Sequence, residues 1–401
     1  MTVTSTATAP TATGQSPAER AAALVPLLRE NAARTENDRR VAQENIDALT
    51  EAGLFRITIP AVYGGEEVSI REFVEMSAQL ARGCGSTAWV ATLVNVCNWL
   101  VGLYPRQAQD EVFGADPNAR VCGVLAPSAT ARAVEGGLVV TGRWGFASGC
   151  MHATWASLGI PVVDASGAQI DQGAALIPIS DLTIEDTWHV AGMRGTASNT
   201  LVADEVFVPS HRILSVTQAV EGNYPVGDEA GALHRSALVP VLALVLAGPQ
   251  VGMARAGQEI VAASLAKGRG ISYTFFDKAS EASLVQNQFA EAVQLIDTAE
   301  LHLLRAADDI DAHAKAATQM DLTSRARARM DTGYVARRSR EALDILLSVQ
   351  GAGSFAEANA LQRIWRDQET SSRHAIVNPA VSTELYGRAL LGVAEQITPL
   401  I

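Results

Sequence analysis

The fold of this chain is decided by Gly351-Ala352-Gly353-Ser354-Phe355, followed by Arg363-Ile364-Trp365-Arg366-Asp367 and then by Ser372-Arg373-His374-Ala375-Ile376-Val377-Asn378-Pro379. Glycines interrupt a helical pattern in this stretch, which predicts two helices joined by a short loop. Beyond the helical arginines the stretch carries an imidazole, His374. Because imidazole exchanges protons near neutral pH, His374 is a candidate for proton transfer or for hydrogen bonding to a substrate.

Length and charge restrict the class of protein further. A chain of 401 residues with 48% hydrophobic residues is long enough for two or three domains with buried cores. The net charge of -12, from 43 acidic against 31 basic residues, argues against nucleic acid and against an anionic membrane surface as partners.

Targeting and metal signals are weak throughout the sequence. The longest apolar run, 237–248, is interrupted by Pro240 and is shorter than the roughly 20 residues that span a bilayer. The Thr- and Ala-rich start lacks the basic and apolar regions of a secretory signal. The four cysteines form no C-x-x-C pair, which favours a reducing compartment and no metal site. We therefore expect a cytoplasmic protein without a metal and without a membrane partner.

Hydrophobic periodicity divides the chain into four parts. We interpret 1–16 as a disordered tail and 17–119 as a helical domain, because apolar residues there recur at every third and fourth position. In 120–221 the period shifts towards two and β-branched residues gather between glycines, which predicts a β-domain of short strands. From 222 to 401 long helical patterns return and predict a helical bundle.

Two motifs in the predicted β-domain stand out. The first is Gly142-Arg143-Trp144-Gly145-Phe146-Ala147-Ser148-Gly149, and the second runs from Trp188 to Thr200 through Gly192-Met193-Arg194-Gly195-Thr196-Ala197-Ser198. Glycines permit close approach of a backbone, and the hydroxyls and amides of the second motif can bind a carbonyl or a phosphate. Each motif alone is compatible with an ordinary strand end or turn.

Taken together, these motifs and the order of helices, strands and helices resemble the acyl-CoA dehydrogenase superfamily over nearly the whole chain. The resemblance implies an α+β fold with an N-terminal helical domain, a central β-barrel-like domain and a C-terminal four-helix bundle. It also implies a homotetramer, a dimer of dimers with the last domain at its centre.

The dehydrogenase chemistry itself is not expected. At the position where those enzymes carry the glutamate of a Tyr-Glu-Gly-Thr segment, this chain has Ala375 beside His374. The alternative glutamate position is also empty, since 236–258 contains no acidic residue. The Arg-x-x-Phe-Gly signature that grips bound FAD is not recognisable in 267–276, and no G-x-G-x-x-G marks a nicotinamide site.

With these departures, the chain resembles the oxygenase components of two-component flavin-dependent monooxygenases, in the branch that hydroxylates phenols and indoles. The resemblance implies reduced flavin (FADH2 or FMNH2) as cofactor, O2 as co-substrate, and a separate NAD(P)H-dependent flavin reductase as partner. It implies that a C4a-hydroperoxyflavin hydroxylates a small, electron-rich aromatic substrate. Such chemistry requires a dry pocket with a fixed polar group near the flavin.

The same resemblance assigns roles to individual residues. Ser148, near flavin N5 and C4a, and His374, facing the substrate, are the expected catalytic residues. His152 is a second candidate because it follows Ser148 closely. The expected cofactor-binding residues are Trp144, Phe146, Ser148, Arg194, Gly195, Thr196 and Ser198. The expected substrate-binding residues are Trp99, Trp155, Phe276 and His374.

Three alternatives remain open at the level of sequence. The chain could be an acyl-CoA dehydrogenase-type flavoenzyme with an unrecognised base. It could be an N- or S-oxygenase of the same fold, which needs no base to activate a ring. It could also be a flavin-binding protein without catalytic activity.

Overall fold

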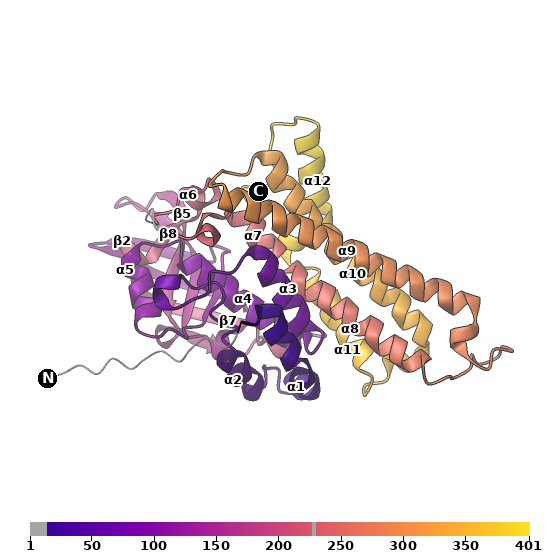
Figure 1. Ribbon diagram of the computed structural model, residues 1–401. Coiled ribbons are helices and arrows are strands. Elements are labelled where there is room, and N and C mark those ends of the chain that lie inside the picture. The colour runs from indigo at the N-terminus through magenta and orange to yellow at the C-terminus, as the bar shows by residue number, and fades with distance from the viewer. Residues whose placement is uncertain (1–13, 227–229) are drawn as a thin grey trace.

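The computed structural model describes residues 14–226 and 230–401, and it consists of helices, then strands, then helices. Figure 1 shows the strands gathered on one side and the long C-terminal helices extending away from them. The predicted fold class is therefore confirmed. A disordered tail was predicted for 1–16, and residues 1–13 of this segment lie outside the described residues. The domain boundaries remain a prediction.

The N-terminal part is a layer of helices closed by side-chain caps. Ser16 caps the first helix, because its hydroxyl accepts from the Glu19 N–H while the Glu19 carboxylate accepts from the Ser16 N–H. Ser69 and Glu72 cap α3 in the same way. The elements of this part are α1 (Pro17–Asn37), α2 (Gln43–Glu51), η1 (Ala61–Tyr63), α3 (Ile70–Ala81), α4 (Gly85–Val101), α5 (Arg106–Gln109) and a π-helical turn η2 (Asp110–Gly114).

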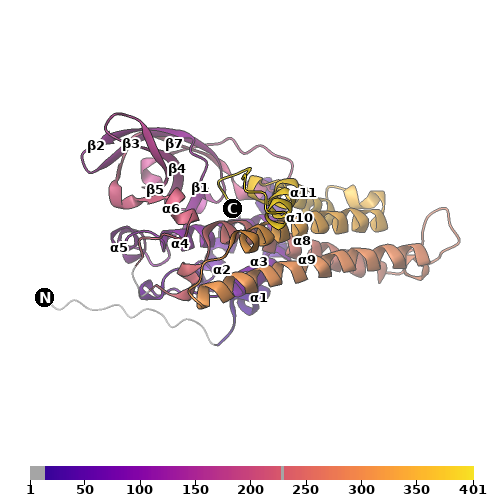
Figure 2. The ribbon, with the colours of Figure 1, turned by 90° about the horizontal axis from the view of Figure 1, so that it is seen from above.

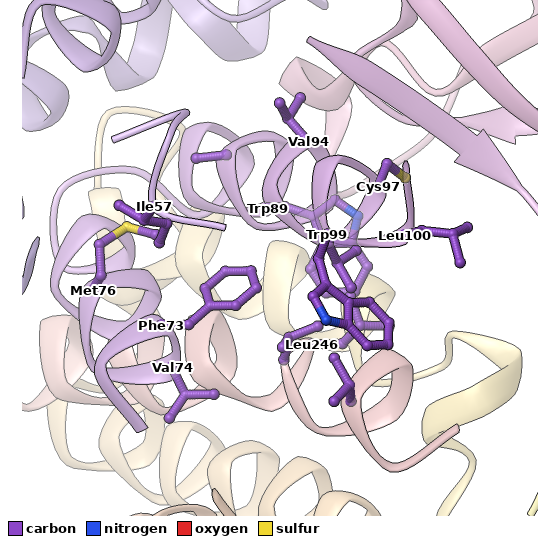
Figure 3. Packing of buried hydrophobic residues seen from close by; sticks show 14 of the residues in the cluster. Ile57, Phe73, Val74, Met76, Trp89, Val94, Cys97, Trp99, Leu100 and Leu246 are labelled. Carbon is purple, nitrogen blue, oxygen red and sulfur yellow. The ribbon is translucent and has the colours of Figure 1, made fainter. Parts of the chain in front are cut away.

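Helix α4 is the centre of the molecule. All but one of its residues are buried, so it has no polar face and must be enclosed by other elements. Figure 3 shows its side chains, among them Trp99 and Leu100, packed in one cluster with Phe73 and Met76 of α3 and with Leu246. A helix buried all round fixes the neighbouring elements relative to one another, and the candidate site lies along it.

The β-domain consists of two four-stranded sheets, ordered β1-β4-β5-β8 and β2-β3-β7-β6. Alternate residues of both sheets face a shared apolar core that includes Trp144, Ile160 and Leu201. Every pairing is antiparallel except the parallel pair β1 and β4. The strands are β1 (Val121–Val124), β2 (Ala129–Val134), β3 (Gly137–Ala147), β4 (Trp155–Val163), β5 (Gln169–Pro178), β6 (Thr183–Glu185), β7 (Asn199–Pro209) and β8 (Ile213–Ser215).

Short 3-10 turns join the strands. They are η3 (Cys150–His152), η4 (Ile179–Asp181), η5 (Arg194–Thr196) and η6 (Ser210–Arg212). The C-terminal part then contains α6 (Val216–Val220), η7 (Ala232–Arg235), α7 (Leu238–Leu244), α8 (Ala247–Leu265), η8 (Ala279–Glu281), α9 (Ser283–Lys315), α10 (Leu322–Gln350), η9 (Ala352–Phe355), α11 (Ala360–Ser371), η10 (Ala375–Val377) and α12 (Pro379–Leu390).

Helices α8, α9 and α10 run side by side, as both views show. At about 1.5 Å per residue, the 33-residue α9 is about 50 Å long and projects well beyond the β-domain (Figure 2). Among the described residues, one helical stretch, Leu238–Leu265, is long and apolar enough to cross a membrane. The protein itself buries 89% of its apolar window, which is typical of a core helix.

Candidate active site

The second sequence motif forms a strained loop around η5. Met193 and Ala197, on either side of this turn, have φ angles of 55° and 46°, in the left-handed region that non-glycine residues rarely adopt. Phe146, on the neighbouring strand β3, has a φ of 65°. Strained backbone of this kind persists only where its surroundings hold it in place, and it clusters at functional sites.

Helix α11 is one of the elements that hold this loop. The Met193 N–H donates to Oδ1 of Asp367 at 2.5 Å, and Arg366 donates to the Ala191 carbonyl. Arg366 also pairs with Glu36 of α1 at 2.6 Å. A Cβ atom added to Gly192 would lie 2.0 Å from the Arg366 carbonyl oxygen, so the loop lies directly on the helix. The Arg366-Asp367 motif therefore connects the C-terminal helices to the β-domain loop.

The Asp367 carboxylate is an unusual anchor because it is buried. Burial raises its pKa to about 6, although the hydrogen bond from the Met193 N–H favours the ionised form. In the sequence, Asp367 stands out only as part of the Arg-x-x-Arg-Asp motif. Its partner is 174 positions away, so no local pattern could have revealed the contact.

Gly195 is required by packing. A Cβ atom there would lie 2.3 Å from Cγ2 of Thr35 and 3.0 Å from Cβ of Ser86. The glycine thus lets the loop pack against α1 and the first turn of α4. From the sequence we expect the glycines of this motif to allow close approach of a flavin. In the structure, Gly192 and Gly195 allow close approach of helices α11, α1 and α4.

Three buried hydroxyls lie in a row beside the loop. The Ser148 and Ser198 oxygens are 2.6 Å apart, and the Ser198 and Thr196 oxygens are 2.7 Å apart. The Thr196 hydroxyl donates to the Met193 carbonyl at 2.8 Å. The backbone continues the connection, since the Gly149 N–H donates to the Thr196 carbonyl at 2.9 Å. The structure thus brings together Ser148, Thr196 and Ser198, three of the residues expected to bind the cofactor.

An aromatic pair, the exposed Phe146 and the half-buried Trp188, lies next to these hydroxyls. Phe146 is 73% exposed, and its ring meets the Trp188 ring edge-on with centroids 5.6 Å apart. The Trp188 indole N–H donates to the Met193 carbonyl at 2.9 Å, which fixes the indole to the strained loop. An exposed phenylalanine held by strained backbone is suited to contact a planar ligand. Trp188 was not among the predicted site residues, although it lies in the second motif.

Helix α4 connects Ser148 with His374. A Cβ atom at Gly149 would lie 3.1 Å from Cγ1 of Val90, and the preceding residue, Trp89, lies 5.9 Å from the His374 ring between ring centroids. Consecutive residues point about 100° apart around a helix. The segment of Ser148 and the imidazole of His374 therefore flank the same turn of α4. The part played by Trp89 was not predicted from the sequence.

His374 is accessible to solvent, yet protein surrounds it. This restricted hydration lowers its pKa to about 4. Because the surrounding protein disfavours the charged form, the imidazole is neutral at physiological pH. Its Nδ1 accepts a long hydrogen bond, 3.4 Å, from the Ile376 N–H. In the neutral ring the proton then lies on Nε2, which becomes a donor.

Trp144 requires a correction. It was predicted to wall the flavin, but its side chain is fully buried between the two sheets, where its indole N–H donates to the Gly159 carbonyl at 2.8 Å. No face of the ring is left for a ligand. Phe146 is the residue of this pair that reaches the surface.

Two of the predicted substrate contacts also lie elsewhere. Trp99 is completely buried in the cluster of Figure 3, and its indole N–H donates to the Leu233 carbonyl. Phe276 lies on the connection between α8 and α9, at the end of the bundle remote from the β-domain (Figures 1 and 2). Trp155 is half-buried, and the Arg212 guanidinium covers one face of its ring at 5.0 Å. Neither Trp99 nor Phe276 joins the cluster around Ser148 and His374.

His152, the second histidine candidate, is a buried structural residue. Arg40 Nε lies 3.4 Å from its Nε2, and burial, assisted by Arg40, lowers its pKa from 6.5 to about 4. Between these two pH values the unfolded chain binds a proton that the folded chain does not bind. The stability due to this shift is therefore complete above pH 6.5 and is lost as the pH falls towards 4.

We expect His152→Gln to remove this acid sensitivity. A shift of two to three pKa units corresponds to on the order of 3 kcal/mol of unfolding free energy. Urea denaturation of both proteins at pH 7.0, 5.5 and 4.5 checks it, and the difference between them isolates His152 from other titrating groups such as Asp367. Parallel pH profiles would contradict the assignment.

One cavity among the described residues lies away from this cluster. It has a volume of about 250 Å³ and lies between α6, η7 and the end of α9, where Tyr224, His234 and His313 line it. In the cluster around η5 the Phe146 ring is exposed on the surface, and the hydroxyl row lies buried beside it.

The residues around η5 fit a flavin. Arg194 Nε is buried and has no hydrogen-bond acceptor within the described residues, so a carbonyl or phosphate oxygen of a ligand would satisfy it. The Ser148 hydroxyl borders the same loop, and the Phe146 ring offers a flat apolar face. A donor, hydroxyls and an exposed ring are the groups that bind a planar, polar-edged cofactor.

This fold and this loop define a class, the flavoproteins with the acyl-CoA dehydrogenase fold. The family model of the acyl-CoA dehydrogenase N-terminal domain matches residues 21–113, and that of the C-terminal domain matches residues 244–379. Within this class, the chain belongs to the oxygenase components of the two-component flavin-dependent monooxygenases, as three relatives demonstrate.

The first of these relatives is the oxygenase subunit HsaA, a flavin-dependent monooxygenase of Rhodococcus jostii. It is 34% identical over 94% of this chain and 98% of its own length. The oxygenase component of an FADH(2)-dependent resorcinol hydroxylase from Rhizobium sp. is 33% identical over 93% of each chain. The solved structure of XiaF from Streptomyces sp., in complex with FADH2 and glycerol, is 35% identical, with a TM-score of 0.90 over 96% of this chain and 97% of that one.

Proposed function

We propose that this protein hydroxylates a small, electron-rich aromatic compound, a phenol or an indole, with reduced flavin supplied by a separate NAD(P)H-dependent reductase. The observation that carries the proposal is the placement of a buried hydroxyl row and a neutral imidazole on two sides of one turn of α4. The relatives that act on resorcinol, on p-hydroxyphenylacetate and on indole-3-acetate support an aromatic substrate.

The chain's own groups would hold the flavin along the η5 loop. Phe146 would lie against the ring system, Arg194 would donate to an oxygen of the cofactor, and Ser148 would contact the edge that carries N5. Reduced flavin supplies the activation of O2 when bound. The residues of this chain position it and limit the access of water.

His374 would contact the substrate. With its proton on Nε2, the neutral imidazole donates a hydrogen bond to the oxygen of a phenolate, or to an acceptor atom on a substituent of an indole. Such a bond holds the ring in place and keeps the substrate oxygen ionised. The geometry favours the donor role over that of a proton acceptor, both of which the sequence left open.

The exposed Phe146 ring is one reason to expect a homotetramer, because a single chain leaves most of this ring uncovered. A second reason is the α8–α9 connection, where Tyr273 and Phe275 are fully exposed. We expect the assembled enzyme to function in the cytoplasm, together with its reductase.

A reconstituted assay tests the proposed function. The purified protein is combined with NADH, a flavin reductase, FAD or FMN, and a panel of phenols and indoles under isotopically labelled O2. We expect one labelled oxygen atom in the aromatic product, and no product without the reductase. Turnover of an acyl-CoA with a dye as acceptor and without a reductase would establish the dehydrogenase alternative instead.

A further inference from the structure

In the hydroxyl row of Ser148, Ser198 and Thr196, the donor of each hydrogen bond can be assigned. It contains three hydrogen bonds, Ser148 to Ser198, Ser198 to Thr196, and Thr196 to the Met193 carbonyl, at 2.6, 2.7 and 2.8 Å. The three side chains are at most 7% exposed, so bulk water does not compete for these bonds. Three hydroxyl protons serve three bonds, so each bond has a single donor.

The carbonyl at the end of the row sets the direction of donation. A carbonyl oxygen only accepts, so the Thr196 proton points to Met193. The Thr196 oxygen must then accept from Ser198, and the Ser198 oxygen must accept from Ser148. No other assignment makes all three bonds. The Ser148 hydroxyl therefore donates its proton to Ser198, and towards a ligand the Ser148 oxygen can only accept a hydrogen bond.

The Met193 carbonyl is itself fixed from outside the row. It also accepts from the Trp188 indole N–H at 2.9 Å and from the Thr196 N–H at 3.2 Å. The N–H of the same residue donates to the buried Asp367 carboxylate at 2.5 Å. A carbonyl with three donors in a loop fastened to α11 cannot easily turn away, so the direction of the row is part of the fold.

We propose that Thr196 and Ser198 are positioning residues that hold the Ser148 hydroxyl as an obligate acceptor, so that the site distinguishes reduced from oxidised flavin at N5. This inference rests on the proposed function, which places Ser148 against the N5 edge. N5 of reduced flavin carries a hydrogen and donates to such an oxygen. N5 of oxidised flavin carries a lone pair, which a second lone pair opposes.

The expected consequence is that the site binds reduced flavin more tightly than oxidised flavin. An acceptor at N5 strengthens binding of the reduced form that the reductase delivers and weakens binding of the oxidised form that must leave. One neutral hydrogen bond changes an affinity by roughly threefold to tenfold. A preference of that size suits an enzyme that exchanges its flavin in every cycle.

Thr196→Val tests the row without touching Ser148. Valine keeps the shape of threonine but cannot bond to Ser198, whose proton then turns to the Ser148 oxygen and frees the Ser148 proton for the ligand. Dissociation constants for FAD and for FADH2 are measured by anaerobic titration calorimetry. We expect the ratio of the FAD constant to the FADH2 constant to fall by roughly threefold to tenfold. Thr196→Ser, which keeps the hydroxyl, should retain the wild-type ratio.

Two further variants keep the outcome decisive. Ser198→Ala interrupts the row one position closer and should lower the same ratio, even if Thr196→Val does not fold. Ser148→Ala should weaken FADH2 binding directly. If Ser148→Ala weakens FADH2 while both row variants retain the wild-type ratio, the inference is wrong and the proposed flavin site stands. If Ser148→Ala also leaves both constants unchanged, flavin does not meet Ser148, and the proposed site fails with the inference.

Discussion

Replacing His374 by alanine is expected to lower the rate of aromatic hydroxylation by roughly 10- to 100-fold while leaving the affinity for reduced flavin almost unchanged. The magnitude follows from the loss of one hydrogen bond to a charged oxygen, about 1.5 to 3 kcal/mol. Flavin binding should be spared because the imidazole contacts Trp89 of α4 and the Ile376 N–H, both outside the η5 loop. Reduced flavin should then still be oxidised, with release of hydrogen peroxide.

Product formation and hydrogen peroxide release, each measured per NADH consumed, separate these two effects. The matched control is His374→Gln, whose side-chain amide can donate but cannot titrate. If Nε2 of His374 acts as a donor, glutamine should restore part of the hydroxylation that alanine loses. Turnover of the alanine variant at the wild-type rate would contradict the role of His374 in ring activation and would favour attack on a nitrogen or sulfur atom.

The sequence predicted the fold and the family because their signals are local. Gly-Met-Arg-Gly-Thr-x-Ser and Arg-x-x-Arg-Asp are continuous motifs, and the change of period from helix to strand and back is visible without any distant contact. The grouping of Ser148, from the motif 142–149, with Thr196 and Ser198 followed from the resemblance to flavoproteins of this fold. Their hydrogen bonds, at 2.6 and 2.7 Å, agree with that grouping.

The prediction about Trp144 failed for a specific reason. The resemblance assigned both Trp144 and Phe146 to the flavin, and regular strand alternation would also put residues two apart on the same face. The pairing of β3 with β7 is irregular between Trp144 and Ala147, and the positive φ of Phe146 turns the backbone within this irregularity. A bulge reverses the faces of the residues that follow it. A non-glycine residue with positive φ leaves no signal in the sequence.

The buried helix α4 accounts for the errors at Trp99 and Trp89. Because nearly all of its residues are buried, its sequence has no polar face from which to infer which side chains face a site and which face the core. Trp99, which the resemblance led us to expect at the substrate, packs in the core, and Trp89, which contacts His374, was not predicted. Contacts that join residues hundreds of positions apart, such as Trp89 with His374, depend on the assembled fold.

Replacing Trp144 by alanine is expected to destabilise the protein by about 3 to 5 kcal/mol, because it leaves a cavity between the two sheets and removes the donor to the Gly159 carbonyl. Phe146→Ala, two positions away, removes a ring that is 73% exposed and should change stability by about 0.5 kcal/mol at most. We expect the opposite order for flavin affinity, with Phe146→Ala weakening FADH2 binding. Urea denaturation and anaerobic titration measure the two quantities on the same samples.

Trp144→Phe separates the cavity from the hydrogen bond. Phenylalanine fills most of the space but cannot donate to Gly159, so it should cost less than alanine and leave mainly the loss of one hydrogen bond, about 1 kcal/mol. Opposite effects of the Trp144 and Phe146 variants on stability and on flavin affinity test the bulge stringently, because regular strand alternation would give both residues the same role. A Trp144→Ala protein as stable as the wild type but unable to bind flavin would show that β3 has no bulge at this point. The indole would then face the cofactor after all.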